Sequence, residues 1–202
     1  MSRRKPTLGA VLLAAAAAAA GALVYADGEA PAPQQEPRAA AGEAYNRDAF
    51  GDGWADTDQD GCDTRAEVLL VQLEDPVLRP ADEGGCLVLS GRLVDPYTGV
   101  VGVVDRSEVD VDHLVALGDA WASGADAWTD EQRGAYANDP AVLVATDASE
   151  NRRKGDRGPN EWSPPDPAAV CWYVTTYEEI KVTYELVITP EQQDAIDDGC
   201  PS

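Results

Sequence analysis

Two stretches of the sequence decide the fold: VDVDH at residues 109–113 and VLVATDASENRRKG at residues 142–155. In the first, valines alternate with acidic residues, which is the period of a strand with one buried face. The second begins with an apolar run that is too short for a helix. It continues through Thr146 and Asp147, either of which can cap a helix, to Gly155, which stops a helix. The sequence therefore predicts two strands and a short helix, with residues 114–141 inserted between the strands.

Apolar side chains at helical spacing, capping boxes and glycine stops predict further helices around this unit. They cover residues 114–122, 129–138, 170–184 and 189–199. Together with the two strands, they predict an α+β fold in which a strand–strand–helix unit is embedded in a mainly helical single domain.

The composition excludes several classes of protein. A chain of 202 residues has room for one ordinary domain, and its 5 Trp and 7 Tyr supply enough core material to exclude wholesale disorder. Its 15 Lys and Arg residues oppose 37 Asp and Glu residues, which gives a formal net charge of −22. Because such a surface repels phosphate, tight nucleic-acid binding through a broad basic face is excluded.

The N-terminus has the pattern of an export signal. Basic residues precede an apolar stretch over residues 8–24, and a small-residue cleavage site ends at Ala26. We expect residues 1–26 to be a signal peptide and residues 27–44, rich in Pro, Ala, Gln and Glu, to be a flexible linker. The protein is then secreted, without stable membrane association after cleavage. The alternative is an uncleaved segment that anchors it in a membrane.

The four cysteines are spaced for disulfides rather than for a zinc site. Cys62, Cys86, Cys171 and Cys200 include no CxxC pair, and an exported protein folds in an oxidising compartment. Three connectivities are open. Pairing Cys62 with Cys86 and Cys171 with Cys200 needs the least chain reorganisation, and each such loop stabilises by about 3–4 kcal/mol in the chain-entropy model.

His113 is the single histidine of the chain, and it follows Asp112 at the end of the first predicted strand. Taken alone, a histidine at a strand end is more often structural than catalytic. Two later segments change this interpretation: NDPAVL at residues 138–143, and NRRKGD at residues 151–156 after an apolar strand.

In this order, the three segments resemble the HNH endonucleases with the ββα-metal fold. The resemblance is strongest to small exported actinobacterial proteins of the DUF1524 type, and a similar series occurs in the HNH domain of RNA-guided CRISPR nucleases. It extends over residues 45–200 and includes YNRDAFGDGWAD at residues 45–56 and DPYTG at residues 95–99. The resemblance implies that residues 45–202 form a disulfide-stabilised nuclease domain with an embedded HNH ββα-metal finger.

The resemblance also implies roles for single residues. His113 is the base that takes a proton from water, while Asp112 and Asn151 hold one divalent cation. One carboxylate and one amide oxygen suit Mg²⁺ or Mn²⁺. Asp110 and Asp112 favour protonation of His113 and a cation opposes it, so we expect activity to rise from acidic towards neutral pH. Asn138 supports the loop around the site, with a plain helix C-cap as the alternative.

A basic patch follows the second strand, at Arg152, Arg153, Lys154 and Arg157. Arg152 and Lys154 are the candidates for contact with a substrate phosphate. The alternative is a solvated helix end whose cations complement the helix dipole. With so few cations, we expect binding of nucleic acid that is weak, salt-sensitive and tolerant of sequence.

A second constellation fits the calcium-loop pattern DxDxDGx5E, with Asp56, Asp58, Asp60 and Glu67 as candidate Ca²⁺ ligands. Against it, Asp63 stands at a usually apolar position, and no helix is expected before the loop. The alternative is an Asp-rich turn that caps a helix over residues 65–73.

The sequence thus predicts a secreted, monomeric, metal-dependent endonuclease that hydrolyses phosphodiester bonds in DNA, or in RNA, with little sequence preference. The rival class is a non-catalytic calcium-binding or cell-surface module that keeps the nuclease fold. A third class, an acidic mimic of DNA, leaves the arrangement of Asp112, His113 and Asn151 unexplained.

Overall fold

A computed structural model describes residues 44–83 and 85–200. The expected signal peptide at residues 1–26 and nearly all of the expected linker at residues 27–44 lie outside the described residues. No helix within the described ranges combines the length and the apolar character that a membrane span requires.

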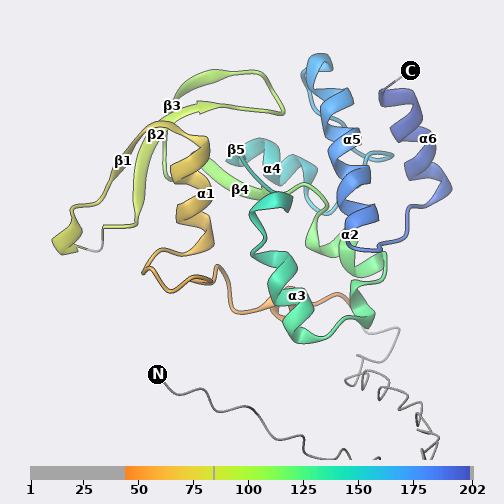
Figure 1. The fold of residues 1–202 in the computed structure, drawn as a ribbon. Helices are drawn as coiled ribbons and strands as arrows, with labels where there is room; N and C mark the ends of the chain where they lie inside the picture. The colour runs from red at the N-terminus through yellow and green to blue at the C-terminus, as the bar shows by residue number, and fades with distance from the viewer. Residues whose placement is uncertain (1–43, 84, 201–202) are drawn as a thin grey trace, which may run out of the picture. The chain divides into compact units, whose positions relative to one another are not determined.

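The predicted strand–strand–helix unit is confirmed (Figure 1). Strand β4 (Val109–His113) pairs antiparallel with β5 (Leu143–Asp147), and helix α4 (Ala148–Lys154) follows β5 directly. The Asp147 side chain caps α4 by accepting from the backbone N–H groups of Ser149 and Glu150, each at a distance of 2.9 Å. Gly155 ends the helix with φ 55°, a left-handed conformation that favours glycine.

The segment inserted between the two strands forms α2 (Leu117–Ala122), η3 (Ala125–Ala127), α3 (Asp130–Ala137) and η4 (Pro140–Val142). The capping box of α3, with Thr129 and Gln132, is as predicted. The helix expected from residue 114 begins only at Leu117, because the Leu114 N–H donates to the Val142 carbonyl over 2.9 Å and extends the strand pairing.

Preceding β4 are η1 (Arg47–Phe50), α1 (Thr64–Gln72), β1 (Glu74–Leu78), η2 (Ala81–Glu83), β2 (Val88–Val94) and β3 (Val101–Asp105). Strands β1, β2 and β3 form an antiparallel sheet in that order, which the sequence did not reveal. In β1, Pro76 and the positive φ of Asp75 interrupt the alternation by which a strand is recognised.

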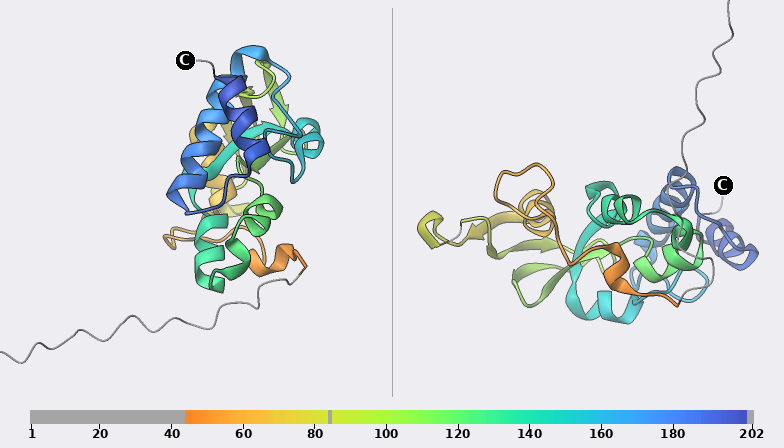
Figure 2. Two further views of the ribbon diagram at one scale, coloured as in Figure 1. Left: turned by 90° about the vertical axis from the view of Figure 1, so that its right-hand side faces the viewer. Right: turned by 90° about the horizontal axis from the view of Figure 1, so that it is seen from below.

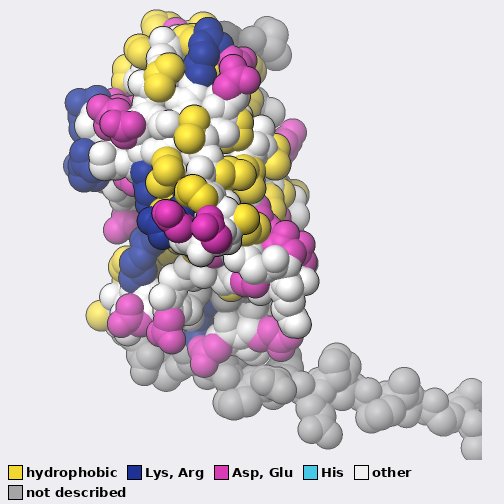
Figure 3. Space-filling model, turned by 90° about the vertical axis from the view of Figure 1, so that its left-hand side faces the viewer, with side chains coloured by type: hydrophobic (Ala, Val, Ile, Leu, Met, Phe, Trp, Pro, Cys, Tyr) yellow, Lys and Arg dark blue, Asp and Glu magenta, His cyan; other side chains and the backbone are white. Residues whose placement is uncertain are grey.

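This sheet buries one face only. On β2, Gly91 and Leu93 are buried, and Gly91 lies so close to Leu73 at the end of α1 that a Cβ atom would come within 2.9 Å of that side chain. On the opposite face, Val94 pairs with Val101, and both are exposed. Figure 3 shows exposed hydrophobic side chains gathered on the side of the molecule that carries the sheet.

The C-terminal part consists of helices α5 (Pro167–Thr183) and α6 (Pro190–Gly199), which lie side by side (Figure 2). The Cys171–Cys200 disulfide joins them, and the Cys62–Cys86 disulfide ties the segment before α1 to the β1–β2 connection. The disulfides thus follow the local connectivity. All described residues belong to one compact unit, so the predicted disulfide-stabilised α+β class is confirmed.

Candidate functional site

A pocket of about 230 Å³ lies where the end of β4, the start of α2 and one side of α4 meet. Polar residues from several elements line it: Arg47, Asp112, His113, Asn151, Arg152 and Asp156. The structure therefore brings His113 together with both expected cation ligands, although Asn151 is distant from them in the sequence.

The imidazole of His113 is held in one orientation and one tautomer. Its Nε2 lies 2.9 Å from the carbonyl oxygen of Ala137. Because a carbonyl oxygen only accepts, Nε2 carries the proton and Nδ1 keeps its lone pair. The ring makes stacked contacts with Trp54, at a centroid distance of 5.5 Å and 6° between planes, and with Tyr136, at 6.2 Å and 20°. Nδ1 is therefore the atom that can take a proton.

Burial, together with the positive charges of Lys154 and Arg47, lowers the pKa of His113 to about 4, against the opposing effect of the contact with Ala137. The side chain is only 6% exposed. The expectation that the protonated form would be favoured is wrong, because burial penalises the charged imidazole and the nearby charges that act on it are positive. The free imidazole is therefore neutral at neutral pH.

Asp112 is buried and held by the Tyr97 hydroxyl, the Lys154 ammonium and the backbone N–H of His113. The Tyr97 hydroxyl donates to Oδ2 over 2.7 Å, and Lys154 Nζ lies 3.1 Å from Oδ1 and 3.0 Å from Oδ2. Burial raises the pKa of Asp112, against the opposing effects of Lys154 and Tyr97. A carboxylate has about four acceptor positions, and the His113 backbone N–H uses one besides those of Tyr97 and Lys154, so a cation at Asp112 would compete with these donors.

The expected role of Lys154 is wrong. Its side chain is 0% exposed, and besides Asp112 it donates to the carbonyl oxygen of His113 over 2.8 Å. A fully buried ammonium cannot reach a substrate phosphate, so Lys154 fixes the end of β4 instead. Lys154 lies in α4 and its partner Asp112 lies in β4, so the sequence around Lys154 does not reveal that it is buried.

Asn151 on α4 faces β4. Its Nδ2 donates to Oδ2 of Asp110 over 3.4 Å, so the amide nitrogen is directed at Asp110 and Oδ1 remains the possible ligand atom. Oδ1 of Asn151 and the carboxylate oxygens of Asp112 are oxygen donors of the kind that Mg²⁺ and Mn²⁺ accept. The donor types fit such a cation, and the positive charge of Lys154 beside Asp112 would oppose its binding.

Sequence reasoning missed Tyr97 as a site residue, although the DPYTG segment that contains it was recognised. The buried carboxylate of Asp95 accepts from the Tyr97 N–H over 2.9 Å, the Thr146 hydroxyl over 3.0 Å and the Asp147 N–H over 3.1 Å. These bonds attach the segment to β5. They bring the Tyr97 hydroxyl to Asp112, with the ring packed edge-on against Trp162 at 4.9 Å.

The basic patch is largely used by the protein itself. Arg153 forms an ion pair with Glu150, and Arg157 donates to the carbonyl oxygens of Arg153 and Lys154 at the end of α4. Of the expected phosphate contacts, Arg152 lines the pocket. Arg47 lines it as well, and no local pattern indicates this because the contact joins distant segments of the chain.

Asn138 closes α3 and also holds a loop. Its Nδ2 donates to the Gly134 carbonyl over 3.0 Å, and its Oδ1 accepts from the Ala55 N–H over 2.8 Å. The C-cap and loop-support interpretations therefore describe two contacts of one side chain.

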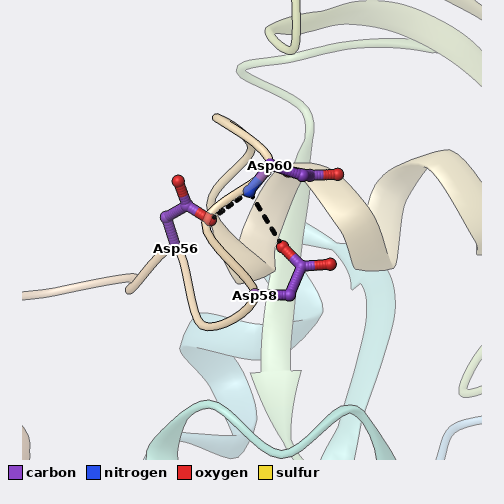
Figure 4. A group of neighbouring side chains, drawn as sticks. All are labelled: Asp56, Asp58 and Asp60. Atoms are coloured by element: carbon purple, nitrogen blue, oxygen red, sulfur yellow. Dashed lines mark hydrogen bonds between the residues drawn. The ribbon is translucent and has the colours of Figure 1, made fainter.

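The Asp-rich loop before α1 is shown in Figure 4. The Asp60 N–H donates to Oδ1 of Asp56 and to Oδ1 of Asp58, at a distance of 3.2 Å in each case. Carboxylate oxygens of the three aspartates lie within 4.8 Å of one another. Glu67 lies in the first turn of α1. Its pKa is raised mainly by partial burial and, to a smaller extent, by repulsion from the aspartates. Asp63 caps this helix by accepting from Ala66, so the expected Asp-rich capping turn is present.

Comparison with known proteins gives two matches. A family model described as GmrSD restriction endonucleases, C-terminal domain, matches residues 63–197. A protein of the fungus Arthroderma benhamiae, described as an uncharacterized secreted protein, is 37% identical over 157 residues, which cover 76% of this chain and 73% of the relative. No solved structure matches the chain significantly. The matched segment contains Asp112, His113 and Asn151, whereas Arg47 and Trp54 precede it.

Proposed function

Because the chain belongs to the family of GmrSD restriction endonuclease C-terminal domains, we propose that its pocket hydrolyses phosphodiester bonds in nucleic acid. DNA is the proposed substrate, with RNA as the alternative. Within that family, we assign the protein to the HNH nucleases of the DUF1524 type. The observation that carries the proposal is that His113, Asp112 and Asn151 line one pocket of a ββα unit.

In the proposed reaction, Nδ1 of His113 takes a proton from a water molecule whose oxygen then bonds to phosphorus. The bond from phosphorus to the 3′ oxygen breaks, and that oxygen takes a proton from solvent, which leaves a 5′-phosphate and a 3′-hydroxyl. The Ala137 carbonyl keeps Nε2 protonated throughout. The negative phosphate beside the ring raises the pKa of His113 when substrate binds, so the imidazole becomes a better base.

Asp112 and Asn151 are proposed to hold one divalent cation, Mg²⁺ or Mn²⁺. When bound, it neutralises charge on the phosphate and on the leaving oxygen. Tyr97 and Lys154 keep the Asp112 carboxylate in place, and Asp110 orients the amide of Asn151.

We further propose that the protein acts outside the cell as a monomer. The relative from Arthroderma benhamiae is described as secreted, and both disulfides suit an oxidising compartment. Nucleic-acid binding is expected to be weak and salt-sensitive, because few cations face the pocket.

The test is nicking of supercoiled plasmid by the purified protein, with Mg²⁺ or Mn²⁺ and with EDTA, beside digestion of single-stranded DNA and RNA. Nicking that requires the cation supports the proposal. The rival module predicts a Ca²⁺-dependent rise of the melting temperature, lost in Asp58→Asn, without cleavage of any substrate. A DNA mimic predicts inhibition of other nucleases instead.

A further inference from the structure

Two guanidinium groups face the pocket from different elements. Arg152 belongs to α4 and Arg47 to η1. Within the described ranges, neither forms an ion pair with a carboxylate, although the chain carries a net charge of −22. Asp156 is an acidic residue of the same pocket, and Arg47 also hydrogen-bonds the Tyr45 side chain.

Arg47 lies close to the proposed base. It lines the pocket of His113 and Asp112, and also a smaller neighbouring pocket of about 40 Å³ that contains His113 and Trp54. Its positive charge acts on the imidazole of His113. A cation in this position is available to an anion that approaches Nδ1.

The segment that carries Arg47 is fixed to the rest of the domain. Phe50 is buried against Trp121 and Tyr136, and the Ala49 carbonyl accepts from Arg133 Nε over 3.0 Å. Further along, Trp54 stacks on His113. The backbone at residue 47 is therefore held beside the pocket, while the guanidinium remains exposed.

The inference rests on the proposed function. We propose that Arg47 is a substrate-contact residue that binds, together with Arg152, the phosphate groups around the scissile bond. It takes the place of Lys154, whose ammonium is buried. Because Arg47 precedes the segment matched by the family model, this contact is an addition of the N-terminal segment to the shared nuclease unit.

The test is binding of a fluorescein-labelled single-stranded DNA 8-mer, followed by anisotropy in EDTA over a series of salt concentrations. For single strands, the slope of log K against log salt is about −0.7 for each phosphate contact. The wild type should give about −1.4, and Arg47→Gln and Arg152→Gln should each give about −0.7 with roughly tenfold weaker binding. Arg47→Lys keeps the slope but binds less tightly, because it loses the planar fork.

Arg79→Gln, an exposed arginine outside the pocket, is the matched control and should behave as the wild type. A melting temperature equal to that of the wild type shows that Arg47→Gln folds. Wild-type slope and affinity in Arg47→Gln, or no binding by the wild type, overturns the inference. Binding through Arg47 without cleavage of any substrate overturns the proposed function alone.

Discussion

The protein contains two buried lysine–aspartate ion pairs of the same construction. They are Lys154 with Asp112 and Lys181 with Asp119. Both lysines are 0% exposed, and each carboxylate also accepts from a tyrosine hydroxyl, of Tyr97 over 2.7 Å and of Tyr177 over 2.5 Å. A buried ion pair by itself therefore does not distinguish a functional site from a scaffold.

The two pairs differ in the other hydrogen-bond donors that surround each carboxylate. Oδ1 of Asp119 accepts from Lys181, and also from Ser123 Oγ over 3.1 Å and Gln192 Nε2 over 3.3 Å. This pair ties α2 to α5 and α6. Asp112 accepts from two side chains, Tyr97 and Lys154, and from the His113 backbone N–H, and it lines a pocket together with His113 and Asn151. We interpret the Lys181–Asp119 pair as part of the scaffold and Asp112 of the other pair as the proposed, pre-positioned cation ligand.

The largest expected effect is on catalytic activity, and it distinguishes the two ion pairs. Asp112→Asn keeps the shape of the side chain but removes its charge, and the rate of plasmid nicking should fall by about 10³-fold. Ser123→Ala removes one donor from Asp119 and should leave the rate unchanged. Equal rates for Asp112→Asn and the wild type would contradict the assignment of Asp112.

The next effect is on stability. Lys154→Met and Lys181→Met each leave a buried carboxylate without its cation, which costs about 3–5 kcal/mol of the free energy of unfolding. Urea unfolding in EDTA should detect both losses. Addition of Mn²⁺ should restore part of the loss in Lys154→Met only, because a cation can take the place of the ammonium beside Asp112. Rescue of both variants, or of neither, would remove the distinction between the pairs.

A smaller effect concerns pH. The pKa of His113 is lowered to about 4 in the folded protein, below its ordinary value of 6.5. As the pH falls below 6.5, the unfolded chain takes up a proton that the folded protein does not, so stability decreases. Between pH 6.5 and 5 the free energy of unfolding should decrease by about 1.6 kcal/mol from this group.

This contribution is measured in EDTA as the difference between the wild type and His113→Asn at the two pH values. The variant lacks the titrating ring and should be less sensitive to pH by that amount. Identical pH dependence of the two proteins would contradict the burial of His113.

How much the sequence could predict depends on how far apart in the chain the interacting residues lie. The β4–β5–α4 unit depends on local signals, namely the alternation before His113, the Asp147 cap and Gly155, and it was predicted correctly. The contacts of Arg47, Trp54 and Tyr97 join segments far apart in the chain, so no local pattern indicates them. Lys154 was misjudged for the same reason, because only its contact with Asp112 shows that it is buried.

The most direct test of the central claim is Mn²⁺ binding, measured by calorimetry on the wild type, His113→Ala, Asp112→Asn and Asn151→Ala, beside plasmid nicking by the same proteins. We predict that His113→Ala binds one Mn²⁺ as the wild type does but no longer nicks. The other two variants should lose both binding and nicking. Undiminished nicking by His113→Ala, or undiminished Mn²⁺ binding by Asp112→Asn, would contradict a base and a cation acting together in this pocket.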